Sequence, residues 1–198
     1  MAELDFWYEF ASTYSYLAAM RAEALAEGAG VRLRWRPFLL GPIFSAQGWN
    51  TSPFNLYPAK GRYMWRDVER LCAQRGLPLR RPEPFPQNSL LAARLAFAVP
   101  DTLRPAFSRA VFHAEFAEGR DISDAATLAA LLASLGLDAG AVLAEATSDA
   151  VKTKLRAETE AAQQAGVFGA PAFVTVDDEL FWGDDRFEPA LAWARGKG

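Results

Sequence analysis

The first part of the chain alternates between apolar and helix-forming stretches in the order strand, helix, strand. Residues 4–10 are almost all apolar or aromatic, which is typical of a buried strand. The composition favours a helix from residue 15 to residue 28, and residues 31–36 then alternate apolar and basic side chains, as a half-exposed strand does. A helix that joins two strands in this way predicts a right-handed crossover and hence a parallel pair.

The middle of the chain is predicted to be helical after a long irregular stretch. Residues 38–59 are rich in glycine, proline, asparagine and serine, and a loop of that length is usually functional. A helix is expected at 60–75, while the proline-dense segment 77–87 cannot be helical. Ser123 and Asp149 are expected to cap two of the further helices, which are predicted at 90–99, 102–117, 123–135, 139–147 and 149–165.

The strand pattern returns near the C-terminus. A strand is expected within residues 167–176, a second one at 179–182, and a last helix at 187–195. We therefore predict an α/β fold that begins as βαβ, continues as a large all-α insertion and finishes as ββα. The expected domains are a discontinuous one formed by 1–37 and 167–198, and a helical insertion domain at 60–166 joined through the 38–59 loop.

Composition narrows the possible functions. The chain has 198 residues, 51% of them hydrophobic, and a net charge of −3 with both signs mixed along the sequence. No nucleic-acid partner is expected from this charge pattern, and no apolar run is long enough to cross a membrane. The single cysteine, Cys72, excludes an internal disulfide and is expected to be buried and inert; with no export signal, we expect a cytoplasmic protein. One cysteine and one histidine exclude a Cys/His zinc cluster, so no metal is expected and the reactive group is expected to be borrowed.

Ser12 lies where the first strand turns into the first helix. Free backbone N–H groups and the positive end of a helix dipole meet at such a corner, which stabilises an anion without a metal. The simpler interpretation is that Ser12 only caps the helix. The corner becomes informative together with Gly169-Ala170-Pro171, which precede the next buried strand. This proline is either an ordinary trans residue at a strand start, or a cis residue close to Ser12 that presents the backbone of Ala170 to a ligand.

Four motifs, taken together, resemble one family. They are Phe10-x-Ser12-x-x-Ser15-Tyr16, Pro58-Ala-Lys60-Gly61-Arg62-Tyr63, Val167-Phe168-Gly169-Ala170-Pro171 and Phe181-x-Gly183-x-Asp185-Arg186. Over nearly its whole length the chain resembles the group that contains 2-hydroxychromene-2-carboxylate isomerase and the kappa-class glutathione transferases. The resemblance implies a thioredoxin-like fold with a helical insertion, glutathione as cofactor and a homodimer.

The resemblance also implies roles for individual residues, beginning with Ser12 as the catalytic residue that hydrogen-bonds the glutathione sulfur. Thr13 stands where relatives often carry proline, which leaves this corner less rigid. The remaining glutathione contacts are expected at Lys60, Ala170, Pro171, Asp184, Asp185 and Arg186. The last three would surround the γ-glutamyl group, whose ammonium suits carboxylates at a helix start. An apolar substrate pocket beside the sulfur is expected at Tyr14, Phe38, Trp49, Phe168 and Trp182, with core packing as the alternative for each.

Three functions fit these features. The first is a glutathione-dependent cis-trans isomerase of 2-hydroxychromene-2-carboxylate-type aromatic pyruvates, small aromatic carboxylates of aromatic degradation. The second is a kappa-class-like glutathione transferase that conjugates small electrophiles. The third is a non-catalytic thioredoxin-like binding module, which explains the missing Cys-x-x-Cys but not the retained site residues. We rank them in that order, and the same thiolate site serves the first two.

Overall fold

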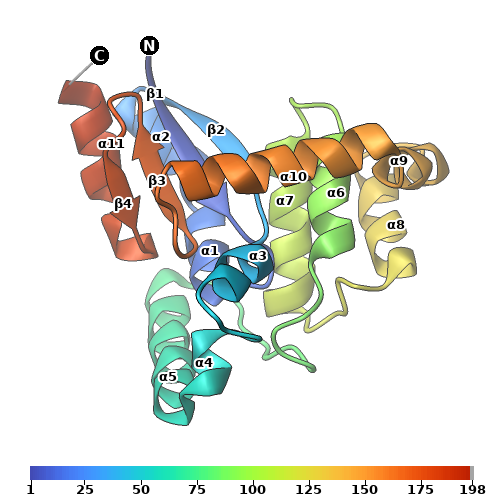
Figure 1. Ribbon diagram of the computed structural model, residues 1–198, viewed down its shortest axis with the longest axis horizontal. Helices are drawn as coiled ribbons and strands as arrows, with labels where there is room; N and C mark the ends of the chain where they lie inside the picture. The colour runs from blue at the N-terminus through green and yellow to red at the C-terminus, as the bar shows by residue number, and fades with distance from the viewer. Residues whose placement is uncertain (197–198) are drawn as a thin grey trace.

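The computed structural model describes residues 1–196 and is built on a mixed four-stranded sheet (Figure 1). The strand order is β2-β1-β3-β4, with β1 parallel to β2 and β3 antiparallel to both β1 and β4. The strands are β1 (Ala2–Tyr8), β2 (Val31–Pro37), β3 (Ala172–Thr175) and β4 (Leu180–Trp182). The expected parallel pair and the ββα ending of the α/β fold are therefore confirmed.

Strand β1 is the centre of the core because it is buried on both faces. Phe6 and Tyr8 point to one side, where Phe6 stacks on Phe173 with ring centroids 5.3 Å apart and Tyr8 hydrogen-bonds Ser108 over 2.7 Å. Trp7 points to the other side and packs edge-on against Phe38. A strand covered on both faces reads as a continuous apolar run, which is what residues 4–10 show.

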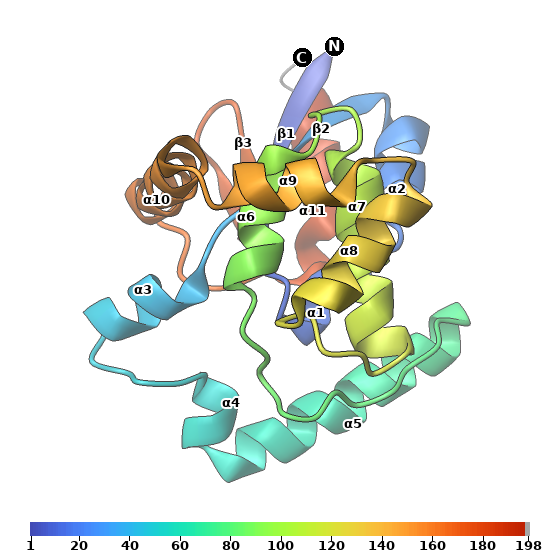
Figure 2. The same ribbon diagram turned by 90° about the vertical axis from the view of Figure 1, so that its right-hand side faces the viewer.

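The helices lie around this sheet in three groups (Figures 1 and 2). Helices α2 and α11 cover one side of the sheet, α6 to α9 gather beside it with α10 running back from them, and α4 and α5 project away from it. Their bounds are α1 (Thr13–Ala19), α2 (Ala22–Ala29), α3 (Leu40–Ala46), α4 (Pro53–Leu56), α5 (Pro58–Arg75), α6 (Leu90–Ala98), α7 (Arg104–Phe112), α8 (Ala125–Ser134), α9 (Ala139–Ala146), α10 (Asp149–Gln164) and α11 (Phe187–Gly196). A π-helical turn η1 (His113–Ala117) extends α7, and a 3-10 turn η2 (Asp184–Arg186) precedes α11.

One hydrophobic core runs from the sheet into the helical block. The same cluster of buried side chains contains Phe6 and Tyr8 of the sheet, Phe112 of α7 and Leu128 of α8. The helices at 60–166 thus pack onto the sheet through a shared core rather than through a separate interface. We therefore keep the separate helical insertion domain at 60–166 as a proposal.

The structure corrects several expected boundaries. The helix expected at 15–28 is two helices, because Arg21 leaves the helical conformation and its guanidinium reaches Asp184. The 38–59 stretch is not irregular throughout, since it holds α3 and α4. Short helices of this kind depend on caps rather than on periodicity: Ser52 accepts a hydrogen bond from the N–H of Phe54, with proline next at the first helical position.

The predicted positions of two helix N-caps are also wrong by one residue. Asp124 rather than Ser123 caps α8, and Ser148 rather than Asp149 caps α10. Their side chains accept from backbone N–H groups of the first turn in both helices. Cys72 is buried as expected, and burial raises the pKa of its thiol to about 11.

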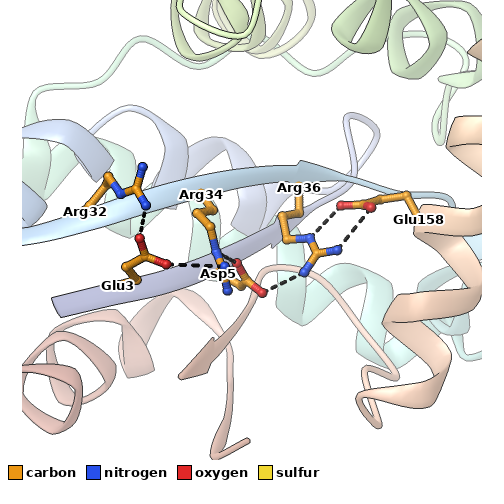
Figure 3. Close-up of polar contacts among 6 residues, drawn as sticks. All are labelled: Glu3, Asp5, Arg32, Arg34, Arg36 and Glu158. Carbon is orange, nitrogen blue, oxygen red and sulfur yellow. Dashed lines mark hydrogen bonds and ion pairs between the residues drawn. The ribbon is translucent and has the colours of Figure 1, made fainter. Parts of the chain in front are cut away.

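An ion-pair network joins β1, β2 and α10 on the face of the sheet that carries Trp7 (Figure 3). Acidic residues of β1 stand opposite the basic residues of β2, and Asp5 accepts from both Arg34 and Arg36. Arg36 also donates from Nε to Glu158 of α10 over 2.6 Å and lies 4.0 Å above the Trp7 ring. The basic side chains that alternate with apolar ones in residues 31–36 therefore form ion pairs within the sheet, and Arg36 links the sheet to α10.

We expect Asp5→Asn to lower the free energy of unfolding by about 1–3 kcal/mol, because it leaves two arginines facing a buried neutral group. Urea denaturation of the purified protein measures this. Glu3→Gln is the matched control in the same strand; since its partners Arg32 and Arg34 are 63% and 46% exposed, its loss should stay below about 1 kcal/mol. Equal losses in the two variants would contradict the central place of Asp5.

Candidate active site

A cavity of about 1440 Å³ lies beside the start of α1. Its walls come from parts of the chain that are far apart in sequence: the corner at 11–14, residues 39–54, one face of α5, the segment 85–90, and the turns at 168–170 and 182–185. Pockets for one drug-sized ligand usually measure roughly 300–1,000 Å³. The cavity therefore has room for a peptide-sized cofactor and a second small molecule together.

Ser12 stands at the point where the corner meets the turn before β3. Its Oγ accepts a hydrogen bond from the N–H of Ser15 over 3.2 Å, as an N-cap of α1 does. The same hydroxyl donates to the carbonyl oxygen of Ala170 over 3.0 Å. Ser12 thus does more than cap a helix, because it joins two segments that are 158 residues apart in sequence.

The Ala170–Pro171 bond is cis and lies beside Ser12, which is the second of the two alternatives considered for this proline. Ala170 lines the cavity, whereas Pro171 is buried behind it. The carbonyl oxygen of Pro171 accepts from the N–H of Gly183 over 2.9 Å, which fixes the turn after β4 against this segment. Ala170 accordingly borders the cavity on a well-supported edge.

Asp184 lies in the cavity wall, but its carboxylate is already occupied. Arg21 donates from Nε to Oδ1 over 3.2 Å, and Arg75 donates from Nη2 to Oδ2 over 2.6 Å. Asp184 is only 3% exposed, and both arginines are mostly buried around it. The structure therefore makes Asp184 the anchor of two arginines, in place of the free carboxylate expected for a ligand ammonium.

The neighbouring residues of the expected binding set differ in their access to the cavity. Asp185 lines it and has a largely exposed carboxylate, whereas Arg186 lies outside it and pairs with Asp185 over 3.2 Å. Lys60 lines the opposite wall at the start of α5, with its Nζ 4.7 Å from the centroid of the Tyr57 ring. Of the two aspartates predicted for this turn, Asp185 is the one whose carboxylate stays largely exposed, with the exposed Arg186 as its ion-pair partner.

Four of the five expected pocket aromatics line the cavity: Tyr14, Trp49, Phe168 and Trp182. Tyr14 donates from its hydroxyl to Asp67 of α5 over 2.9 Å, and burial followed by this hydrogen bond raises its pKa. Phe168 and Trp182 form a half-exposed aromatic rim with ring centroids 4.9 Å apart. Gly169 between them is required by space, since a Cβ there would lie 2.5 Å from Trp182 Nε1.

Phe38 is the exception among these aromatics, and its assignment to the pocket is corrected. It is 1% exposed and packs edge-on against Trp7, with ring centroids 5.9 Å apart. Pro37 ends β2 directly before it, so the side chain stays on the buried face of the sheet. Core packing, the alternative interpretation, holds for this residue.

Sequence reasoning missed several polar residues of the cavity wall, among them Glu9, Arg75, Gln87 and Ser89. Burial raises the pKa of Glu9 to about 7, while hydrogen bonds from Ser89 and from the backbone of Ala11 act in the opposite sense. Arg75 presents a buried Nη1 that has no hydrogen-bond partner among the described residues. Glu9 could have been found from the sequence, because it is a charged residue inside the apolar run 4–10. Arg75 could not, because an arginine near the end of a helix is common.

Comparisons with known proteins agree with this architecture. A family model described as a DSBA-like thioredoxin domain matches residues 3–191. A 2-hydroxychromene-2-carboxylate isomerase of Sphingobium xenophagum is 34% identical over 187 residues, which make up 93% of this chain and 94% of that protein. The chain belongs to this isomerase family of DsbA-like thioredoxin domains. The resemblance carried by the four motifs is thereby confirmed.

Two more members of the wider group show how far the similarity extends. A solved structure of a 2-hydroxychromene-2-carboxylate isomerase aligns with a TM-score of 0.87 at 28% identity, covering 98% of this chain and 95% of the other. Human glutathione S-transferase kappa 1 is 28% identical over an alignment 200 residues long, which covers 93% of this chain and 87% of that protein. In this chain a thioredoxin-like sheet carries a block of helices. Among the residues that the structure describes, no helix combines the length and apolarity needed to cross a bilayer.

We expect Asp184→Asn to lower the free energy of unfolding by about 2–4 kcal/mol, because it strands two largely buried guanidinium groups. For a domain of this size such a loss lowers Tm by roughly 5–15 °C, which differential scanning calorimetry measures. Asp185→Asn is the adjacent control, and its exposed carboxylate should contribute no more than about 0.5 kcal/mol. A stable Asp184→Asn protein would show that the arginines are held by something else.

Proposed function

We propose that this protein is a glutathione-dependent cis-trans isomerase of 2-hydroxychromene-2-carboxylate-type aromatic pyruvates. The observation that carries the proposal is the contact of Ser12 with the cis Ala170–Pro171 segment inside a cavity of about 1440 Å³. The same corner carries the sequence Ser12-Thr13-Tyr14-Ser15, without a cysteine of its own. The position that holds a thiolate in redox relatives is thus left for the thiolate of a bound cofactor.

The cavity offers a partner for each polar part of glutathione. The backbone of Ala170, which borders the cavity, is available for strand-like hydrogen bonds to the peptide. Asp185 receives the γ-glutamyl ammonium, and the unpartnered Nη1 of Arg75 receives its carboxylate. Lys60, on the opposite wall, takes the carboxylate at the peptide's other end or that of the substrate.

The proposed chemistry is nucleophilic catalysis with a borrowed nucleophile. The bound thiolate adds to the electron-poor carbon of a ring-opened aromatic pyruvate, which turns the double bond into a single bond that rotates; elimination then releases the other geometry and free glutathione. In this proposal the hydroxyl of Ser12 turns its proton from the Ala170 carbonyl to the sulfur, and together with the N–H groups at the start of α1 it stabilises the thiolate by ~1–3 kcal/mol. The aromatic rim of Phe168 and Trp182 suits an aromatic acceptor.

A glutathione transferase is the second candidate, and the similarity to human glutathione S-transferase kappa 1 favours it. It uses the same thiolate site and differs only in leaving glutathione attached to the electrophile. A non-catalytic binding module gives no reason for a buried titratable Glu9 in the cavity wall. We also infer a homodimer and a cytoplasmic location, which sedimentation analysis and cell fractionation would test.

We expect Ser12→Ala to reduce turnover at least about tenfold, because the thiolate loses a hydrogen bond worth about 1.4 kcal/mol. The ultraviolet absorbance of bound thiolate, followed against pH, should show a raised pKa of the glutathione sulfur. Ser15→Ala is the matched control: its Oγ is buried without a partner among the described residues, and its backbone N–H still reaches Ser12. Unchanged activity of Ser12→Ala at pH 7 would remove Ser12 from the mechanism.

The fate of glutathione separates the isomerase from the transferase. An isomerase regenerates the thiol in every cycle, so about one hundredth as much glutathione as substrate should support complete conversion of 2-hydroxychromene-2-carboxylate. Absorbance reports conversion, and a thiol reagent reports free glutathione. Stoichiometric loss of thiol with an electrophilic acceptor, together with no conversion of the chromene, would assign the protein to the transferases.

A further inference from the structure

Glu9 is a buried carboxyl group that faces the cavity, and the thiolate chemistry above does not use it. It lies three residues before Ser12, and its backbone carbonyl accepts from the N–H of Ser12 over 3.1 Å. Its side chain is 7% exposed and opens onto the same cavity. Ser89, on the 85–90 wall, donates a hydrogen bond to its Oε1. The carboxyl group is therefore held in a fixed position near the proposed site of the sulfur.

The groups around Glu9 leave its charge uncompensated. Among the described residues, no lysine or arginine forms an ion pair with Glu9, and the donors that act on it are Ser89 and the backbone of Ala11. The titratable group that faces it from the helical block is Glu115 of η1, which is fully buried and lacks a hydrogen-bond partner within the described chain. Burial, then the charges of Glu9 and Asp121, raise the pKa of Glu115 well above its usual range.

The cavity wall around Glu9 is polar. Gln87 lies in this wall and accepts at Oε1 from the N–H of Ile122 over 2.8 Å, while its Nε2 is buried without a partner in the described structure. Unsatisfied buried donors of this kind are costly unless a ligand or water completes them. The Glu9, Gln87 and Ser89 side chains thus form a polar subsite next to Ser12.

The proposed substrate needs a proton transfer before glutathione can act. In a 2-hydroxychromene-2-carboxylate, the hydroxyl oxygen and the ring oxygen are attached to the same carbon, and the conjugated ketone that accepts a thiolate exists only after the ring opens. We propose that Glu9 is the catalytic residue of this ring opening, so that one active site performs both the opening and the isomerisation. This assignment rests on the proposed function and adds a step to it.

The step balances with Glu9 alone. The Glu9 carboxylate takes the proton of the hydroxyl group, and the electron pair of that O–H bond becomes the second bond of the new ketone. The bond between this carbon and the ring oxygen breaks, and its electron pair leaves on the phenolic oxygen. The protonated Glu9 then returns the proton to the phenolate, because a carboxyl group has one oxygen to accept and one to donate. Glu9 is regenerated, and no proton is consumed.

The test compares two substrates in one variant. Glu9→Gln keeps the size of the side chain and an acceptor for Ser89 but removes the base. With the cyclic substrate its kcat should fall at least about tenfold. With the cis isomer of a benzylidenepyruvate that lacks the ring hydroxyl, and therefore cannot cyclise, it should match the wild type. The glutathione KM should stay unchanged with both substrates.

The pH profile supplies a second readout that a structural role would not move. In the wild type, kcat with the cyclic substrate should rise as the pH passes about 7, because the ionised form of Glu9 is the base. This limb should be absent with the open-chain substrate and absent in Glu9→Gln. Ser89→Ala should move it to higher pH, since the lost hydrogen bond favoured the carboxylate. Ser89→Ala also keeps the assignment testable if Glu9→Gln does not fold.

Glu115→Gln is the matched control, an equally buried carboxyl group that does not line the cavity, and it should keep both activities within about twofold. Equal losses of Glu9→Gln on the cyclic and open-chain substrates, or no loss on either, would overturn the assignment of Glu9. No turnover of either substrate by the wild type is a different result, because it removes the proposed function and the ring-opening step with it.

Discussion

The carboxylate of Asp184 is the point on which the arrangement of the cavity depends. It holds Arg21, at the junction of α1 and α2, and Arg75, at the end of α5. These elements carry the Ser12 corner and the wall with Lys60, while the turn of Asp184 itself presents Asp185. One buried charge with two guanidinium partners therefore fixes three walls relative to one another, and each wall carries a residue of the proposed glutathione site.

The sheet provides the rest of the positioning through burial rather than charge. Because β1 is covered on both faces, its end cannot move without disturbing Phe6 on one side and Trp7 on the other. Glu9 and Ser12 follow directly from that end, so a rigid strand places both of them. The cis-proline segment belongs to the neighbouring strand β3, which explains how two stretches from opposite ends of the chain meet at one corner.

Much of this was predictable because it is local. Alternation and apolar runs indicated all four strands, and the motifs around Ser12 and Pro171 indicated the corner. The role of Asp184 was not predictable, since its partners are 163 and 109 residues away and nothing in their own neighbourhoods distinguishes them. The prediction that Phe38 lines the pocket was wrong for a related reason. Apolar side chains that line a cavity and those that pack in a core cannot be distinguished in sequence, and only the register of β2 decides between them.

The shared core of sheet and helical block has a consequence for motion. Because the helical block packs against the sheet through buried aromatic rings, it cannot move relative to the sheet as a rigid lid. The arm formed by α4 and α5 is different, because α4 buries none of its residues and α5 is held at its middle, where Tyr14 contacts Asp67, and at its end, where Asp184 contacts Arg75. The start of α5, which carries Lys60, has no buried residue, so local opening of the cavity wall costs least there.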